Sequence, residues 1–303
     1  MSVDEIPILF IVFNRPDTTA RVWETLRTLR PKRLFVAADG PRNAREAENC
    51  EQTRAIVRSP DWDCDLKKLF REYNAGLKRA VVEALDWFFD NVEEGVVLED
   101  DCLAHPDFFR FCAAMLERFR DDDRVYHIGG NNWQRGRRVG TWSAYFSLYP
   151  HIWGWATWRR AWKLMDAEMR LWPSFRDAGM MRELFPHPTV ARWWQNRLER
   201  VWRGEFPGAW SYQWTFAGWV NGKLSLTPNV NLVSNIGFGR QGTHTLGSRR
   251  HHLAAAPVAP LPAPYTAPPF FVPCRSADLR AFRYVFKPNY GIKLLNKIHQ
   301  WVD

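Results

Sequence analysis

The first hundred residues alternate short apolar runs with longer stretches in which apolar residues recur every three or four positions. Four of the runs have the length of a buried strand: Ile6–Phe13, Arg33–Ala38, Leu66–Phe70 and Gly95–Leu98. Runs that are apolar throughout, rather than alternating with polar residues, are typical of strands covered on both faces. The pattern therefore predicts a parallel sheet with helices on either side.

The stretches between and after these runs have the spacing of amphipathic helices. Pro106 predicts the start of one helix, Asn74 can cap another, and the polar stretch Ala44–Arg58 predicts a third. The apolar stripes are Val22, Leu26 and Leu29; Leu77, Val81, Leu85 and Phe88; and Phe109, Cys112, Leu116 and Phe119. Alternating strands and helices define the α/β class, here a Rossmann-like, mostly parallel sheet flanked by helices.

Each predicted strand ends in a polar cluster. The clusters are Asn14–Arg15, Asp39–Gly40, Arg71–Asn74 and Glu99–Asp101. Open parallel sheets bind their ligands outside the carboxyl ends of the strands. Because those ends share one edge of the sheet, we expect the four clusters to line one ligand site.

The acidic triplet Glu99–Asp100–Asp101 directly follows the apolar run Val96–Leu98. Mn²⁺ and Mg²⁺ prefer carboxylate oxygens, and Mg²⁺ commonly takes one or two of them together with substrate phosphates. An isolated acidic triplet is more often a solvated loop at the end of a strand. The neighbouring strand-end clusters favour a metal site instead.

Two other clusters each have a structural and a functional interpretation. Asp39 and Gly40 begin a tight turn by composition, and Asn14 and Arg15 occupy the turn that would cap the first helix. As ligand contacts, Asp39 would accept a hydrogen bond from a base or ribose. Arg15 would bind phosphate beside the free N–H groups of a helix N-terminus.

The net charge of +9 indicates polyanionic partners, namely nucleotide diphosphates, anionic lipid or nucleic acid. The chain shows no DNA-binding helix, zinc-finger spacing or single-strand-binding signature, so nucleic acid is the weakest of the three and we expect none.

Five cysteines without a CxxC pair indicate a reducing compartment. Since no signal-peptide pattern is found, we expect a cytoplasmic protein.

Tryptophan is concentrated in the middle of the chain, where 13 of the 17 fall between Trp133 and Trp219. Indole rings serve either as plates in a core or as platforms on which sugar rings stack. We expect Trp153 and Trp155, in a Trp–Gly–Trp segment, to lie near a saccharide acceptor. The alternative is that both rings are core residues.

Composition changes again in the last fifty residues. Seven prolines in Ala256–Pro273 indicate a stiff extended segment, and Ala277–Asp303 interleaves basic with aromatic and aliphatic residues. We therefore divide the chain into a catalytic domain at 1–250 (donor half about 1–104, acceptor half about 105–250), a proline-rich linker at 251–276 and a basic amphipathic segment at 277–303. That last segment would rest peripherally on the anionic inner face of a membrane, or alternatively pack back on the domain.

A series of short motifs runs through roughly residues 5 to 247. The first are Phe13–Asn14–Arg15–Pro16, Ala38–Asp39–Gly40–Pro41, Asn74–Ala75–Gly76–Leu77 and Leu98–Glu99–Asp100–Asp101. The later ones are His127–Asn131, Trp153–Ala156, Trp210–Trp214, Asn231–Phe238 and Thr243–Thr245. This ordered set resembles bacterial GT-A glycosyltransferases related to N-acetylglucosaminyltransferase I.

The resemblance implies a GT-A-type fold with a Trp-rich acceptor half. It also implies inverting, metal-dependent transfer of a sugar from a UDP-type nucleotide sugar to a saccharide or lipid-linked acceptor, in the synthesis of surface polysaccharide or glycoconjugates. Asn14, Arg15 and Asp39 would bind the nucleoside. Asn74 and Gly76 would line the diphosphate, and Glu99 and Asp100 would contact the ribose and the sugar.

The resemblance further implies that Asp101 is the direct ligand of Mn²⁺ or Mg²⁺. His244 would be a late contact to the metal or the diphosphate. The alternative for His244 is a polar histidine in a loop.

The resemblance leaves the catalytic base open. Inverting transfer needs a carboxylate to take the proton of the acceptor hydroxyl. Relatives carry an Asp within the Trp–x–Tyr–Gln segment, where this chain has Ser211, and a serine hydroxyl cannot serve unaided. Glu205, six residues upstream, is the nearest substitute in the sequence, and a surface charge is its alternative.

Two other functions stay open on the sequence. A nucleotidyltransferase shares the sheet and the carboxylate-held metal, but it normally has a Gly-rich phosphate loop after the first strand, where this chain has Asn14–Arg15–Pro16. A non-catalytic nucleotide-sugar-binding protein would keep the fold and lack the base, which is consistent with Ser211.

Overall fold

The structure, a computed structural model, describes residues 2–238 and 251–287. Within them, eight strands form one mixed sheet in the order β3-β2-β1-β4-β8-β6-β9-β7, and β5 pairs with β10 in a small second sheet. The strands are β1 (Ile8–Val12), β2 (Arg33–Ala38), β3 (Asp65–Phe70), β4 (Glu94–Glu99), β5 (Cys102–Ala104), β6 (Val125–Gly129), β7 (Ala144–Ser147), β8 (Trp155–Trp158), β9 (Leu224–Pro228) and β10 (Val233–Asn235).

The longer helices follow the strands in sequence. They are α1 (Pro16–Leu29), α2 (Ala44–Val57), α3 (Leu77–Asn91), α4 (Pro106–Arg118), α8 (Pro188–Trp202) and α9 (Ser211–Val220). The shorter ones are α5 (Arg159–Trp162), α6 (Trp172–Asp177), α7 (Met180–Leu184), α10 (Arg275–Ala281), η1 (Val3–Glu5), η2 (His251–Leu253) and η3 (Phe282–Phe286).

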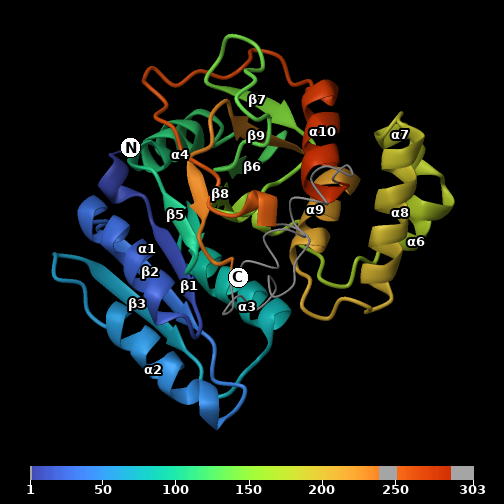
Figure 1. The fold of residues 1–303 in the computed structure, drawn as a ribbon. Helices are drawn as coiled ribbons and strands as arrows, with labels where there is room; N and C mark the ends of the chain where they lie inside the picture. Colours follow the sequence, from blue (N-terminus) through green and yellow to red (C-terminus); the bar gives the residue numbers. More distant parts are fainter. Residues whose placement is uncertain (1, 239–250, 288–303) are drawn as a thin grey trace.

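The first four strands are parallel, with β1 between β2 and β4 and β3 at the outer edge (Figure 1). The strand order reverses direction at β1, since β2 and β3 lie on one side of it and β4 lies on the other. Right-handed crossovers put α1 and α2 side by side on one face, and the reversal puts α3 on the opposite face. The four strands and four helices predicted from the sequence for this half are confirmed, with shifts of a few residues at their ends.

The second half of the sheet is mixed. β8 is antiparallel to both β4 and β6, β6 is parallel to β9, and β7 closes the edge antiparallel to β9. The α/β class and the mostly parallel sheet flanked by helices are thus confirmed. Figure 1 shows α6, α7 and α8 gathered beyond this half, away from the N-terminal strands.

The tryptophans of the middle segment form much of the core under this half. Trp155 lies on β8, is only 1% exposed, and has ring centroids 5.8 Å from Trp214 and 6.0 Å from Trp210. A strand between β4 and β6 is covered on both faces, so its side chains have no access to solvent. The prediction that Trp155 lies against an acceptor is therefore wrong, and this ring is a core plate.

His127 is held in the same aromatic core. Its Nδ1 accepts a hydrogen bond from Trp214 Nε1 at 3.2 Å, so its Nε2 carries the proton and donates to the His151 carbonyl at 3.0 Å. Burial lowers the pKa of His127 to about 3. The residue is a neutral hydrogen-bonding element of the core.

The segment beyond residue 250 packs on the main sheet wherever the structure describes it. Leu261 N donates to Asp107 Oδ2 at 3.0 Å, and Thr266 N donates to Ser143 Oγ at 3.0 Å. On α10, the buried Asp278 accepts from Ser147 Oγ at 2.6 Å and from Leu148 N at 3.1 Å. The buried apolar side chains of α10 and η3 are Ala277, Ala281, Phe282 and Val285.

Residues 277–286 thus belong to the packed structure, as the alternative to membrane contact predicted. Residues 288–303, which carry Lys293 and Lys297, lie outside the described residues. No helix in the described ranges is long and apolar enough to cross a membrane.

Asp278 gives the docking of α10 a definite pH dependence. Burial raises the pKa of Asp278 to about 6, above the unfolded value of about 3.9. The native state therefore binds the proton more tightly, so the stabilisation is fully present below pH ~4 and is lost as the pH rises through ~6. We expect wild type to lose about 2–3 kcal/mol of unfolding free energy between these limits through this group.

The measurement is chemical denaturation at pH 4.5 and pH 7.5 for wild type and Asp278→Asn. The amide has no charge to desolvate, so the variant should show a smaller fall in stability with pH. Asp177→Asn, an exposed acid on α6, is the matched control. An identical pH slope in wild type and Asp278→Asn would contradict the assignment.

Candidate active site

The sheet order places the predicted polar clusters at neighbouring strand ends. β1 pairs with both β2 and β4, with Val12 opposite Ala38 and Ile11 opposite Glu99. The residues that follow these strands are Asn14–Arg15, Asp39 and Asp100–Asp101. They meet at the point where the strand order reverses, which is where open α/β sheets bind ligands.

Arg15 connects the first of these clusters to the acidic one. Its Nη2 lies 2.8 Å from Asp100 Oδ1, and its Nη1 lies 2.9 Å from Asp101 Oδ2. The other Asp100 oxygen, Oδ2, accepts from the Phe13 backbone N–H at 3.1 Å. The turn after β1 therefore contributes a guanidinium and a main-chain donor to the carboxylates after β4. This ion pair was not predicted from the sequence, where the only signal for it is that an acidic triplet at the end of a buried strand requires a nearby cation.

The acidic cluster contains three carboxyl groups and one cation paired with two of them. Among the described residues, Glu99 has no hydrogen-bond or ion-pair partner, and Arg15 is the cation paired with the other two. Burial, together with the charges of Asp101 and Asp100, raises the pKa of Glu99 to about 8. Burial likewise raises the pKa of Asp100 to about 6, against the opposing effect of Arg15. Burial opposes the charge of Arg15 as well, but the two aspartates outweigh it and raise the pKa of Arg15.

The segment after β10 lies directly over this ion pair. Ile236 N donates to the Asp101 carbonyl at 2.8 Å, and Gly237 N donates to Asn235 Oδ1 at 2.9 Å. A Cβ on Gly237 would lie 2.3 Å from Asp101 Oδ2 and 2.5 Å from Arg15 Nη1. Only glycine permits so close an approach of the backbone to the ion pair. In the sequence, the only sign of this close approach is the glycine within Asn235–Phe238, which was noted there only as part of a motif.

Asp39 has a different environment, because its carboxylate is already saturated. Its oxygens accept from Gly40 N (3.0 Å), Asn74 Nδ2 (2.9 Å), Ala75 N (2.9 Å) and Gly76 N (3.2 Å). These bonds tie the end of β2 to the segment that leads into α3. The turn interpretation of Asp39 thus has a clear structural basis, and the predicted nucleoside contact stays a prediction.

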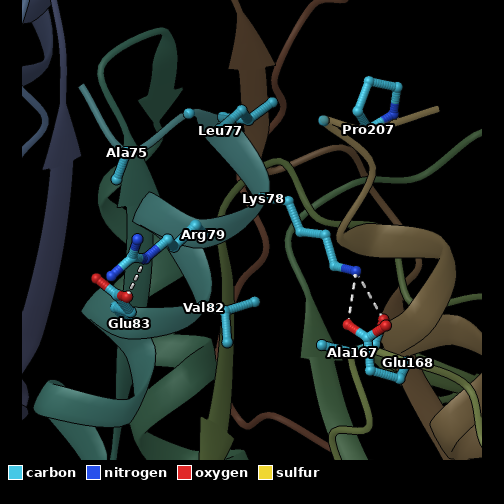
Figure 2. A pocket seen from close by; sticks show the side chains of 11 residues that line it. Ala75, Leu77, Lys78, Arg79, Val82, Glu83, Ala167, Glu168 and Pro207 are labelled. Atoms are coloured by element: carbon cyan, nitrogen blue, oxygen red, sulfur yellow. Dashed lines mark hydrogen bonds and ion pairs between the residues drawn. The ribbon is translucent and has the colours of Figure 1, made fainter. Parts of the chain in front are cut away.

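The start of α3 remains open to a ligand on another side. Its N-cap is Gly76, at φ +80°, so the first turn of the helix has no side-chain cap. A cavity of about 610 Å³ adjoins it (Figure 2). The cavity is lined by Ala75, Gly76, Leu77, Lys78, Arg79, Val82, Glu83, Ala167, Glu168, Pro207 and Gly208.

Two basic side chains of α3 border that cavity. Lys78 Nζ donates to the Ala167 carbonyl at 2.8 Å and pairs with Glu168 at 3.3 Å, across the opening in Figure 2. Arg79 pairs with Glu83 on the same helix. A helix N-terminus with adjacent cations favours anions, so this end of the cavity suits phosphate.

The residues considered for the base lie elsewhere. Glu205, after α8, is half-exposed and pairs with Arg200 at 2.5 Å. Pro207 and Gly208 of the same loop line the cavity, so Glu205 lies near its border. Ser211 begins α9. His244 lies outside the described residues.

A divalent cation fits the chemistry of the acidic cluster, although the described residues assemble no group of three or more metal-ligating side chains. The donors are hard carboxylate oxygens, and one of them, Glu99, lacks any partner among the described residues. Mg²⁺ typically takes one or two protein carboxylates together with waters and substrate phosphates, so a complete protein cage is not required. The cluster therefore fits a cation that is bound jointly with a phosphate ligand.

Comparison with known proteins finds no family model and no curated protein that match the chain. Among solved structures, it is similar to 4-diphosphocytidyl-2C-methyl-D-erythritol synthase from Anaerococcus prevotii, with a TM-score of 0.34 and 8% identity over 53% of this chain and 75% of that one. It is also similar to a UDP-glucose pyrophosphorylase complexed with UDP-glucose, with a TM-score of 0.29 and 9% identity over 52% and 78%.

A third similar structure is mannose-1-phosphate geranyltransferase from Thermus thermophilus, with a TM-score of 0.32 and 12% identity over 73% of both chains. These similarities are distant and concern the fold alone. The function must therefore be argued from the site.

The saturation of Asp39 predicts a stability defect in Asp39→Asn. The amide NH₂ would face backbone N–H groups and leave at least one of them unpaired, at a cost of about 1–3 kcal/mol. We expect this loss of unfolding free energy in chemical denaturation without any ligand present. Asp63→Asn, at an exposed acid just before β3, should change stability little. Equal stability of wild type and Asp39→Asn would show that these bonds are dispensable.

Proposed function

We propose that the protein is a glycosyltransferase that moves a sugar from a UDP-type nucleotide sugar to a saccharide or lipid-linked acceptor. The observation that carries the proposal is the Glu99–Asp101 cluster, in which the buried Asp100 and Asp101 and the partly buried Glu99 share one permanent cation at the reversal point of the sheet. Such a site favours a further cation and a ligand that brings its own phosphates. A nucleotide-diphosphate sugar is a ligand of that kind.

The uncapped start of α3 supports the placement of the diphosphate. First-turn N–H groups, Lys78 and Arg79 border the same cavity as Gly76. In the proposal, Asn74 and Gly76 line the diphosphate, and Asn14, Arg15 and Asp39 form the nucleoside side of the site. Asp39 would act there mainly by holding the backbone of Ala75 and Gly76 in position.

The cation would be Mn²⁺ or Mg²⁺, with Asp101 as its direct ligand and Glu99 and Asp100 beside it. When bound, it supplies positive charge to a diphosphate leaving group. The residues of the chain fix the directions of the carboxylates: Arg15 and Phe13 N hold Asp100, and Arg15 holds Asp101. Preorganised groups of this kind need no rearrangement as charge develops.

The acceptor side of the proposal rests on Trp153 and Glu205. Trp153 is half-buried, with its ring edge-on to Trp133 at 5.3 Å and to Phe238 at 5.6 Å. Phe238 directly follows Gly237, which lies against the acidic cluster, so Trp153 contacts the segment that covers the cluster. Glu205 would take the proton of the acceptor hydroxyl after release from Arg200, and the transfer would invert the anomeric centre.

The first test is Asp101→Asn. We expect sugar transfer to fall by at least about 100-fold, because the leaving group loses its electrostatic support, while the melting temperature changes little. Excess EDTA should abolish wild-type activity, and Asp177→Asn should be as active as wild type. Full activity of Asp101→Asn, or of wild type in EDTA, would contradict the metal-assisted mechanism.

The product distinguishes the proposed reaction from that of a nucleotidyltransferase. A glycosyltransferase releases UDP from the UDP-sugar. A nucleotidyltransferase releases pyrophosphate from a nucleoside triphosphate and a sugar phosphate. Pyrophosphate release without UDP release would replace the proposal by that alternative, and donor binding without either product would indicate a non-catalytic binding protein.

The second test concerns the acceptor. Trp153→Ala should raise the acceptor KM several-fold and leave the donor KM unchanged, since the ring would contact only the acceptor. Trp142→Ala is the matched control, because Trp142 packs edge-on to Phe270 of the proline-rich segment at 5.3 Å. A rise in both KM values, or in neither, would remove Trp153 from the acceptor site.

A further inference from the structure

Arg15 has an unusual position for a residue expected only to bind a ligand. Its planar guanidinium spans the carboxylates of two consecutive residues, at 2.8 Å to Asp100 and 2.9 Å to Asp101. The Arg15 side chain is 15% exposed, and its Nε is buried without a partner among the described residues. An arginine keeps its charge in proteins, so this is a permanent cation inside the acidic cluster.

The oxygens that Arg15 occupies are those a hard cation would use. Asp100 Oδ1 and Asp101 Oδ2 bind the guanidinium, and Asp100 Oδ2 accepts from Phe13 N. The remaining Asp101 oxygen has only a weak contact at 3.5 Å to Cys102 Sγ. A divalent cation at these carboxylates would share lone pairs with Arg15 and would be repelled by its charge.

The charges of the cluster explain why it can bind Arg15 and also a divalent cation. Cation binding favours the ionised carboxylates, and in that state the three carboxylates and the one guanidinium carry a net charge of −2. A divalent cation would neutralise that charge, but it would then lie next to the positive charge of Arg15. A donor diphosphate changes the situation, because it offers the guanidinium a new anionic partner within the site.

We propose that Arg15 is the resident counter-ion of the Glu99–Asp101 cluster and competes there with divalent cations. In the protein without donor, Arg15 fixes the orientation of the Asp100 and Asp101 carboxylates and weakens cation binding. When a diphosphate is present, Arg15 pairs with it and releases the aspartates. This inference rests on the proposed function, since it assumes a diphosphate ligand, but its first readout needs only the cation.

The test is Mn²⁺ binding to the full chain without nucleotide, measured by calorimetry, for wild type, Arg15→Gln and Arg15→Lys. Arg15→Gln removes a positive charge a few ångströms from the bound cation, and with it the repulsion between the two. We therefore expect Arg15→Gln to bind Mn²⁺ at least about tenfold more tightly than wild type. Arg15→Lys keeps the charge but cannot bridge both carboxylates, so its affinity should fall between the two.

The matched control is Arg42→Gln. Arg42 stacks over the Phe13 ring at 5.4 Å, pairs with Glu46 and does not contact the acidic cluster, so its loss should leave Mn²⁺ affinity unchanged. UDP affinity provides a readout of opposite sign, because Arg15→Gln should bind UDP more weakly while it binds Mn²⁺ more tightly. A purely structural role would weaken both.

Unchanged or weaker Mn²⁺ binding by Arg15→Gln overturns the competition. No Mn²⁺ binding by any variant also overturns it, and makes the cluster a structural ion pair. If Arg15→Gln does not fold, Arg15→Lys decides the question through the same comparison. Tighter Mn²⁺ binding in a protein that transfers no sugar would keep the competition and reject the proposed function.

Discussion

Burying Asp100 and Asp101 next to a third carboxyl group, with a single permanent cation, costs free energy, and much of the local structure offsets that cost. Arg15 sits in the turn after β1 because its guanidinium reaches Asp100 and Asp101 from there, and Phe13 contributes its N–H to the same cluster. The chain after β10 returns to the Asp101 carbonyl through Ile236 N, and residue 237 is a glycine because its backbone touches both members of the ion pair. The carboxyl of Glu99 has no partner among the described residues, and a divalent cation at this edge of the sheet would favour its ionised form.

Asp39 shows the contrasting use of a carboxylate at the same edge. Its oxygens are filled by backbone and side-chain donors, so it fixes the path from β2 into α3 and has little charge left to offer. The fixed backbone leaves the first turn of α3 uncapped beside a cavity of about 610 Å³. Asp39 is thus saturated by donors of the scaffold, whereas Asp100 and Asp101 share one guanidinium and Glu99 has no partner among the described residues. This difference in hydrogen bonding separates structural from candidate functional carboxylates better than position alone.

The second half of the sheet supplies a rigid support for that edge. β8 enters antiparallel between β4 and β6, and Trp155 of β8 and Trp162 of α5 both pack against Trp214 of α9. A neutral His127, fixed by Trp214 and the His151 carbonyl, completes the core. The segment from residue 251 to α10 then lies along β7 and α4, bound through Asp107, Ser143 and Asp278.

The sequence by itself determined the elements and the edge where the site lies. Continuous apolar runs and helical stripes are local patterns, so β1 to β4 and α1 to α4 could be predicted, as could the meeting of Asn14–Arg15, Asp39 and Glu99–Asp101 at neighbouring strand ends. The sequence could not determine which side chains become hydrogen-bond or ion-pair partners, or which of them are buried. Whether Trp155 faces solvent or core depends on β8 entering between two other strands, and whether Asp39 is saturated depends on where Ala75 and Gly76 pass. The pairing of Arg15 with Asp100 and Asp101 joins residues more than eighty positions apart, and only the folded sheet brings such charges within hydrogen-bonding distance.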